Sequence, residues 1–316
     1  MTESTGIHHQ AWGDGPPVLA LHGLGLESTS FAGLAEGVTA LGLRMLAADL
    51  PGFGLTPAPD APLSAEELAK PVLELAAGLD PKPLVMGMSL GGRVALEAAL
   101  LEPDLFRGVV AMAPPLPRRT HRQVLAGARL LSPEVAKHIP IELAWPLLKR
   151  LADRQEAALT GSAAHDWFLR SSKRTIYYIS CPATRRAFVS AARELATEPA
   201  FGSGGLWTRV ESLGIPAAFD WGGKDRIVGT RNGALVAAAV PEAFQVRVPC
   251  AGHFDNGPHF ACMQQGALQG IELVEAVLAG HDPLGEAVRS DVVGCLVDGR
   301  YDVDQGVEEA AAAGGS

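Results

Sequence analysis

Short apolar runs alternate with longer helical patterns along most of this 316-residue chain, and this alternation constrains its fold more than any other feature. Such alternation is typical of a mostly parallel β-sheet flanked by helices on both faces. The runs of strand length cover residues 7–12, 18–21, 44–49, 84–88, 108–113, 215–221 and 244–248. The helical patterns between and after them cover residues 64–79, 90–101, 231–239 and 267–279. The sequence therefore predicts an α/β fold.

The alternation stops between residues 116 and 206, where the sequence becomes mostly helical, with few strand-like runs. The clearest helical patterns there cover residues 141–158, 164–178 and 184–197. Strand-like runs return afterwards, so this stretch is an insertion into one α/β unit rather than a second half of it. We therefore expect a core of residues 1–115 and 207–280, with a helical cap (lid) over residues 116–206.

The last part of the chain, residues 281–316, differs from both of these regions. Asp298-Gly299, a pair typical of tight hairpin turns, separates strand-like residues 292–297 from residues 300–303. Residues 308–316 contain only Glu, Ala, Gly and Ser, a composition that favours a frayed end. We expect an acidic C-terminal extension that contains a hairpin.

The charge balance is acidic but uneven along the chain. Hydrophobic residues make up 47% and charged residues 19%, so a wholly disordered chain is excluded. The net charge of −9 argues against a nucleic-acid partner, because such proteins carry a basic excess. The predicted cap nevertheless holds 14 Lys and Arg against 7 Asp and Glu. These cations form either a solvated face or a site for an anionic group, such as a carboxylate, a CoA phosphate or a lipid surface.

Several features bear on the compartment and on cofactors. Residues 1–14 lack the basic start and apolar core of a signal peptide, and no apolar run approaches the roughly 18 residues of a membrane span. The cysteines are far apart and lack the spacing of a zinc site, which favours reduced, mostly buried thiols; they are Cys181, Cys250, Cys262 and Cys295. We expect a cytoplasmic protein without stable membrane insertion, metal or organic cofactor.

The sharpest local motif is Gly87-Met88-Ser89-Leu90-Gly91, a G-x-S-x-G between a predicted strand and a predicted helix. This setting is that of a nucleophile elbow, in which small residues permit a crowded turn and the serine projects from the edge of the sheet. The helix that follows favours negative charge at its N-terminus. Ser89 is therefore the candidate nucleophile, and the alternative is a serine that only caps the helix.

A serine nucleophile needs a base, and the base needs an orienting acid. His253 lies just past the predicted strand at 244–248, where its loop could hang over the sheet edge. Asp225 lies in a glycine-rich loop that leaves the preceding strand, whereas Asp220 lies inside that strand. Asp255 is too close to His253 in sequence to orient it easily. Position thus predicts Asp225 as the acid and His253 as the base.

The order Ser89, Asp225, His253 resembles that of the α/β-hydrolase fold family. Two further motifs carry the resemblance, His22-Gly23-Leu24-Gly25 and Asp49-Leu50-Pro51-Gly52-Phe53-Gly54, and it extends over about residues 7–280. The N-terminal part is shorter than is usual in the family, which predicts a missing edge strand. The tail from His281 onward has no counterpart in the minimal fold.

The resemblance implies further site residues. The backbone N–H groups of Leu24 and Leu90 would form the oxyanion hole, and His22 would hold its loop in place by hydrogen bonds. The inserted segment would be a cap that shapes the substrate pocket. Its aromatic residues are either walls of that pocket or the cap's own core; they are Trp145, Trp167, Phe168, Tyr177, Tyr178 and Phe188.

These features predict a serine hydrolase that cleaves a carboxylic ester of a largely apolar acyl substrate. Hydrolysis of a C–C bond in a diketone-type substrate and hydrolysis of a CoA-like thioester are alternatives on the same fold. A different class of alternative is a non-catalytic receptor for a small ligand. An enzyme with an aspartate nucleophile is excluded, because position 89 is serine. The predicted partner is a small acyl substrate, with a possible homo-oligomer formed through the C-terminal extension.

Overall fold

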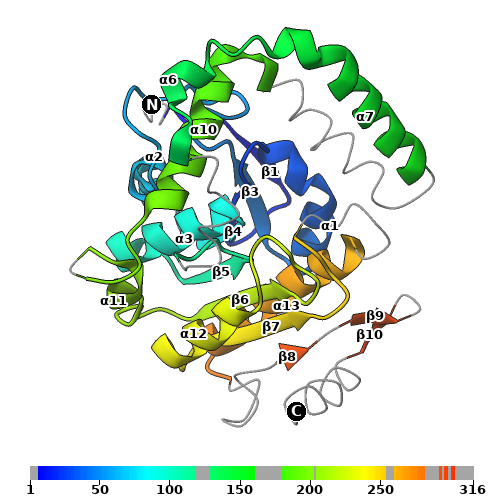
Figure 1. Cartoon of the computed structure of the whole chain (residues 1–316). Helices are drawn as coiled ribbons and strands as arrows, with labels where there is room; N and C mark the ends of the chain where they lie inside the picture. Colours follow the sequence, from blue (N-terminus) through cyan, green and yellow to red (C-terminus); the bar gives the residue numbers. More distant parts are fainter. Residues whose placement is uncertain are drawn as a thin grey trace, which may run out of the picture.

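A computed structural model describes residues 6–117, 129–160, 179–202, 204–253 and 260–281, and three short strands between residues 292 and 302. Its main feature is an eight-stranded sheet with the order β1-β3-β2-β4-β5-β6-β7-β8 (Figure 1). All neighbouring strands are parallel except β1 and β3. The strands are β1 (His9–Trp12), β2 (Pro17–Leu21), β3 (Arg44–Ala48), β4 (Leu84–Met88), β5 (Gly108–Met112), β6 (Ala217–Gly222), β7 (Phe244–Val248) and β8 (Val292–Val293). The predicted α/β fold with a mostly parallel sheet is confirmed.

Helices cover both faces of this sheet. They are α1 (Ala32–Ala40), α2 (Ala65–Ala77), α3 (Leu90–Leu101), α6 (Pro133–Ala136), α7 (Trp145–Leu159), α10 (Pro182–Thr197), α11 (Leu206–Val210), α12 (Arg231–Ala239) and α13 (Phe260–Leu278), with 3-10 turns η1 (Ser28–Phe31), η2 (Pro103–Leu105) and η3 (Ile141–Ala144). Buried residues of α1 and α13 pack on one face, and those of α2, α3 and α12 pack on the other. Among the described residues, no helix is both long and apolar enough to cross a membrane.

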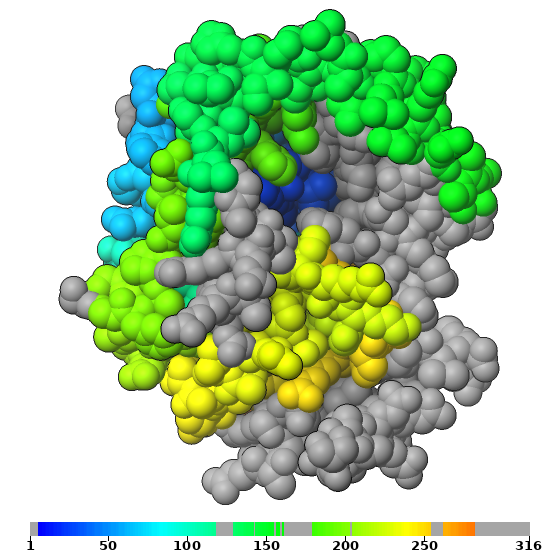
Figure 2. All heavy atoms as spheres, viewed as in Figure 1, coloured from blue at the N-terminus to red at the C-terminus, as the bar shows by residue number. Residues whose placement is uncertain are grey.

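Between β5 and β6 the described residues form helices but no strand, as the sequence predicts for residues 116–206. We call residues 116–206 the inserted segment. Figure 2 shows the atoms of α6 and α7 (green) along one rim of the molecule, with a hollow between them and the yellow atoms around α12. The predicted helix at 164–178 lies outside the described residues. The helix predicted at 184–197 begins two residues earlier, at Pro182, because proline suits the first helical turn.

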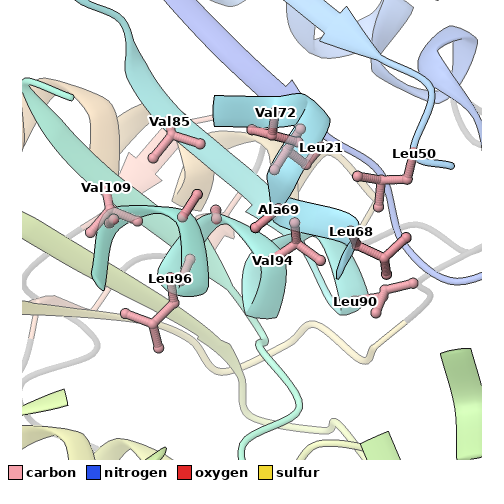
Figure 3. Close-up of a cluster of buried hydrophobic side chains, with 14 of the residues drawn as sticks. Leu21, Leu50, Leu68, Ala69, Val72, Val85, Leu90, Val94, Leu96 and Val109 are labelled. Carbon is pink, nitrogen blue, oxygen red and sulfur yellow. The ribbon is translucent and has the colours of Figure 1, made fainter. Parts of the chain in front are cut away.

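The core is centred on β2, β4 and β5, whose residues are buried on both faces of the sheet, as continuous apolar runs predict. On one face, Val85 of β4 and Val109 of β5 belong to a cluster with Val94 and Leu96 of α3 (Figure 3). The side chains of α2, including Leu68, complete that layer. Alternate strand residues, such as Met86, pack instead against α1 and α13. The strand that precedes Ser89, β4, is therefore packed on both of its faces.

The C-terminal extension differs from the prediction in one respect. The strands β9 (Cys295–Val297) and β10 (Arg300–Asp302) pair antiparallel, as expected for a hairpin. Residues 292–293, however, do not belong to the hairpin: they form β8, which pairs with β7 in parallel. The prediction of one strand over 292–297 is therefore wrong. An open edge of β7 would leave ladder groups unpaired, and β8 satisfies two positions of that edge.

Candidate active site

Ser89 stands at a strained turn between β4 and α3. Its φ of +52° and ψ of −118° are uncommon for a residue other than glycine. A Cβ atom at Gly87 would collide with the backbone of Gly91, and one at Gly91 would collide with the carbonyl group of Leu21. The backbone N–H of Ser89 donates to Met112 O at 2.8 Å, which ties the turn to the end of β5. Steric crowding therefore explains the glycines on both sides of the serine.

The structure brings the three predicted residues Ser89, Asp225 and His253 into direct contact. The Nε2 atom of His253 lies 2.9 Å from Ser89 Oγ, and its Nδ1 atom lies 2.7 Å from Asp225 Oδ2. The side chains of His253 and Asp225 are 3% and 0% exposed. Ser89 follows β4, Asp225 follows β6 and His253 follows β7, so the carboxyl edge of the parallel sheet brings the three residues together.

The loop that carries Asp225 is joined to the loop that carries His253. Gly223 N donates to Val248 O, and Lys224 N donates to Ala251 O, both at 2.9 Å. A Cβ atom at Gly223 would lie 2.6 Å from Pro249 O, so only glycine fits this close approach.

The carboxylate of Asp225 is also fixed by its own loop. Its Oδ1 atom accepts hydrogen bonds from Ile227 N at 2.7 Å and from Val228 N at 2.8 Å. The other oxygen, Oδ2, is thereby aimed at His253. Asp220, the residue that the sequence analysis set aside, is not part of this cluster.

The predicted oxyanion donors, Leu24 and Leu90, flank the serine. Leu90 follows it directly, and a Cβ atom at Gly23 would lie 3.5 Å from Met88 O, which places the Leu24 loop against the residue before the serine. Among the hydrogen bonds of the described residues, neither the Leu24 N–H nor the Leu90 N–H has an acceptor. Both donors are therefore available to a ligand.

His22 holds the loop that carries Leu24 from within the core. Its Nδ1 atom lies 2.8 Å from Gly23 O, and its Nε2 atom accepts a hydrogen bond from Leu50 N at 2.9 Å. Burial lowers the pKa of His22, which favours the neutral ring with the proton on Nδ1. This arrangement agrees with the positioning role that the family resemblance implies.

Asp49 joins three segments around the same loop. Its carboxylate accepts hydrogen bonds from Ser28 N at 2.6 Å and Leu55 N at 2.9 Å, and it contacts His8 Nδ1 at 2.8 Å. Burial alone would raise the pKa of Asp49, but the two N–H donors stabilise the carboxylate and hold the pKa below its ordinary value. Gly54, with a φ of +55°, leaves room for this carboxylate.

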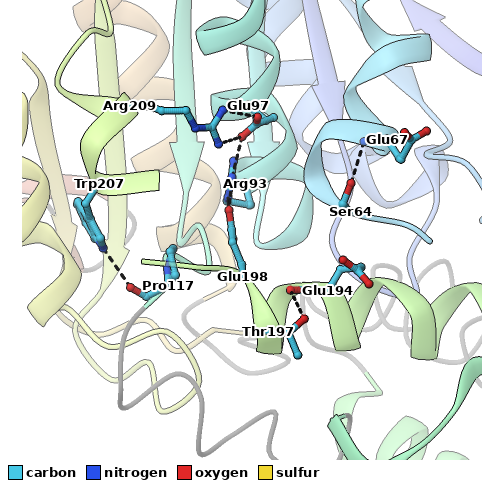
Figure 4. Close-up of polar contacts among 10 residues, drawn as sticks. All are labelled: Ser64, Glu67, Arg93, Glu97, Pro117, Glu194, Thr197, Glu198, Trp207 and Arg209. Atoms are coloured by element: carbon cyan, nitrogen blue, oxygen red, sulfur yellow. Dashed lines mark hydrogen bonds and ion pairs between the residues drawn. The ribbon is translucent and has the colours of Figure 1, made fainter. Parts of the chain in front are cut away.

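A buried charge network that the sequence analysis missed lies one turn along α3 from the serine (Figure 4). Arg93, 1% exposed, forms ion pairs with Glu97 at 2.7 Å and with Glu198 at the end of α10. Arg209 of α11 donates to Glu97 Oε1 at 2.6 Å. Burial alone would raise the pKa of Glu97, but its bonds to Arg209 and Arg93 lower it. The only sequence signal was the opposite-charge pair at spacing four on an otherwise apolar helix.

Asp220, which lies inside β6, is a further buried acidic residue. It is 0% exposed, and neither carboxylate oxygen has a hydrogen-bond partner in the described structure. Its Oδ2 atom faces Gly266 of α13, where a Cβ atom would come within 2.8 Å. Burial raises the pKa of Asp220 to about 8, so the folded protein holds it as the neutral acid at neutral pH.

The predicted pocket residues are only partly described. Trp145 is half-buried at the start of α7, and Phe188 of α10 packs against the main core cluster. The other aromatic candidates, Trp167, Phe168, Tyr177 and Tyr178, lie outside the described residues. The described residues contain no group of three or more His, Cys, Asp or Glu that could hold a metal ion.

A protein-family model for the alpha/beta hydrolase fold matches residues 16–260, so the chain belongs to this family. An uncharacterized protein of Mycobacterium tuberculosis is 27% identical over 250 residues, which are 77% of this chain and 71% of that protein. The pimeloyl-[acyl-carrier protein] methyl ester esterase of Vibrio vulnificus is 37% identical over 111 residues, 35% of this chain and 41% of the esterase.

The solved structure of a thermophilic esterase from Thermogutta terrifontis has the same fold. Its TM-score is 0.59 at 20% identity, over 87% of this chain and 92% of the esterase. Together these similarities support an α/β-hydrolase enzyme.

Proposed function

We propose that this protein is a serine hydrolase that cleaves a carboxylic ester of a largely apolar acyl substrate through an acyl-enzyme. The observation that carries the proposal is the His253 ring, which contacts Ser89 Oγ at 2.9 Å and Asp225 Oδ2 at 2.7 Å. These are the contacts by which a base activates a serine and an acid orients the base. The partial relationship to a methyl ester esterase supports an ester as the substrate.

In the first half of the reaction, Ser89 Oγ attacks the ester carbonyl carbon while its proton moves to His253 Nε2. The N–H groups of Leu24 and Leu90 donate to the oxygen that becomes negative in the tetrahedral intermediate. When the intermediate collapses, the C–O bond to the alcohol breaks, and the departing oxygen takes the proton from His253. Each oxyanion donor of this kind contributes roughly 3 kcal/mol to the transition state.

In the second half, His253 accepts a proton from water, whose oxygen attacks the acyl group on Ser89. The carboxylic acid leaves as His253 returns the proton to Ser89 Oγ. Asp225 keeps the ring proton on Nδ1 and stabilises the positive imidazolium in both halves. In this proposal, the inserted segment acts as a cap, with Trp145 among the walls of an apolar pocket.

The test is hydrolysis of p-nitrophenyl butyrate by the Ser89→Ala variant, with Ser212→Ala, an exposed serine, as the matched control. We expect Ser89→Ala to lose at least about 1,000-fold in kcat and Ser212→Ala to keep the wild-type rate. A fluorophosphonate probe should label the wild type and Ser212→Ala but not Ser89→Ala.

Full ester hydrolysis by Ser89→Ala would overturn the assignment of the nucleophile. A wild-type protein that neither hydrolyses esters nor reacts with the probe would instead be a receptor on the same fold. Faster turnover of an acyl-CoA or of a diketone than of the matching ester would replace the ester in the proposal, while leaving the role of Ser89 intact.

A further inference from the structure

The inserted segment carries large apolar side chains on its surface. Leu143 of η3 is 82% exposed, and Leu147 and Leu151 of α7 are 60% and 52% exposed. Leu147 and Leu151 are four residues apart and so lie on one face of α7, and Leu143 lies four residues before Leu147 in the turn that leads into the helix. Contiguous exposed leucines are costly in water and mark an interaction surface rather than a solvated face.

Two arginines of α7 lie on the same face of the helix as Leu147 and Leu151. Arg150 and Arg154 follow Leu147 at spacings of three and seven, which places them on the same face. Among the described residues, neither arginine forms an ion pair. The acidic residues of α7, Asp153 and Glu156, point elsewhere around the helix, and Asp153 pairs with Lys149 at 3.0 Å.

We name the set Leu143, Leu147, Arg150, Leu151 and Arg154 the α7 leucine face. It belongs to the most basic part of the chain: the inserted segment has a net charge of +7, whereas the remainder has −16. α7 lies along the outer rim of the molecule in the space-filling view (Figure 2). An anionic surface would therefore attract this rim and repel the remainder, which fixes the orientation of approach.

We propose that the α7 leucine face binds the surface of an anionic lipid membrane, with the leucines in the acyl boundary and the arginines at lipid phosphates. A helix that combines leucines with arginines and lacks acids on the same face is typical of helices that lie in the membrane interface. A second copy of the chain that docks through the same face is a poorer occupant, because the two basic faces would repel each other. The surface of an acidic protein would form ion pairs with the arginines, but it would not bury the three exposed leucines.

The test is co-sedimentation of the full chain with vesicles of phosphatidylglycerol or of phosphatidylcholine. We expect the wild type to bind phosphatidylglycerol vesicles in low salt, to bind more weakly as salt rises, and to prefer them over phosphatidylcholine. The variant L143S/L147S/L151S should lose about 100-fold in partition coefficient. R150Q/R154Q should lose about 10-fold or more on phosphatidylglycerol and little on phosphatidylcholine.

The matched control is Leu278→Ser, which removes a leucine that is 41% exposed on α13, in the acidic remainder. It should bind like the wild type. The triple variant should keep the wild-type circular dichroism and the wild-type rate on soluble p-nitrophenyl acetate, because its leucines pack against nothing in the core.

Four results would overturn the proposal. The wild type fails to bind phosphatidylglycerol vesicles, or the triple variant binds them as well as the wild type does. The wild type forms a dimer in sedimentation velocity that the triple variant loses, which would assign the face to a second copy. The triple variant folds but loses hydrolysis of the soluble ester, which would place the leucines in the substrate pocket.

Discussion

The two long helices of the inserted segment, α7 and α10, have almost the same length, 15 and 16 residues, but differ in what they bury. α10 buries one face made mainly of small side chains, whereas Ala152 is the single buried residue among the described side chains of α7. The buried residues of α10 are Arg185, Ala187, Ser190, Ala191, Ala192, Leu195 and Ala196. The large leucines of α7 remain exposed.

The contacts of α10 explain the difference. Ser190 Oγ accepts a hydrogen bond from Leu63 N at 3.0 Å, and Glu198 at the helix end pairs with Arg93 of α3. A Cβ atom at Gly52 would lie 2.5 Å from Ala187 Cβ, so the helix backbone approaches the core closely. Small side chains permit this approach, and bulky ones would prevent it. α10 is thus joined to the part of the molecule that holds Ser89, whereas the large leucines of α7 stay exposed.

We expect catalysis to depend on the residues that the edge of the sheet positions. Replacing Asp225 by Asn should lower kcat for p-nitrophenyl butyrate by about 10,000-fold, because the amide would favour the wrong tautomer of His253. The control is Asp220→Asn, which changes a buried aspartate of β6 that contacts neither Ser89 nor His253 and should keep the wild-type kcat at pH 7. Equal losses in both variants would contradict the assigned role of Asp225.

The buried carboxyl group of Asp220, unlike that of Asp225, has no hydrogen-bond partner in the described structure. Its pKa is about 8 in the folded protein and 3.8 ordinarily, so unfolding releases a proton between these pH values. Stability should therefore fall as pH rises from about 4 to about 8, by up to about 5 kcal/mol, and Asp220→Asn should remove this component. Urea unfolding of both proteins at pH 5.5 and 8 measures it. Parallel pH dependences would show that Asp220 ionises normally.

The anchor of α10 can be tested against the free arginines of α7. Arg93→Met should destabilise the protein by about 3 to 5 kcal/mol, because it leaves the carboxylates of Glu97 and Glu198 without their buried partner. Arg154→Met, on α7, should stay within about 0.5 kcal/mol of the wild type. Thermal unfolding at pH 7 measures both variants. Similar losses in the two would mean that α7 is held by charge as α10 is.

The packing difference itself gives the smallest effects. Ala187→Leu should destabilise the protein by about 1 to 3 kcal/mol, since the new side chain must displace the Gly52 loop. Leu147→Ala should change stability by less than about 0.5 kcal/mol, because the leucine is 60% exposed. Urea unfolding separates the two outcomes. A loss above 2 kcal/mol for Leu147→Ala would show that α7 packs against the folded protein through its leucines.

Much of the fold could be predicted because its signals are local. Periodicity alone located α3, α12, β4 and β7 with the bounds that the structure has. The hairpin of the extension was predicted from an Asp-Gly pair, but the pairing of β8 with β7 was not. A two-residue strand has no periodicity, and its partner lies more than 40 residues away in sequence.

The candidate site shows the same division. The turn at Ser89 can be predicted from the sequence because side chains at its glycine positions would collide with nearby backbone atoms. The choice of Asp225 over Asp220 rested on position alone, and the contact with His253 supplies what position could not. The Arg93 network could not be predicted, because Glu198 lies far from Arg93 in the sequence. The exposure of the α7 leucines could not be predicted either, because an amphipathic pattern does not specify what its apolar face contacts.

Two features could be predicted from local patterns in the sequence: the alternation of strands and helices, and the strained turn at Ser89. These depend on backbone sterics and on side-chain periods of two or 3.6 residues, which act within a few positions. Only the tertiary structure decided that His253 meets Ser89, 164 positions away, and that Glu198 meets Arg93, 105 positions away. Such contacts form only when the sheet brings distant strand ends together. The tertiary structure also shows that α10 packs against the core whereas the large leucines of α7 stay exposed.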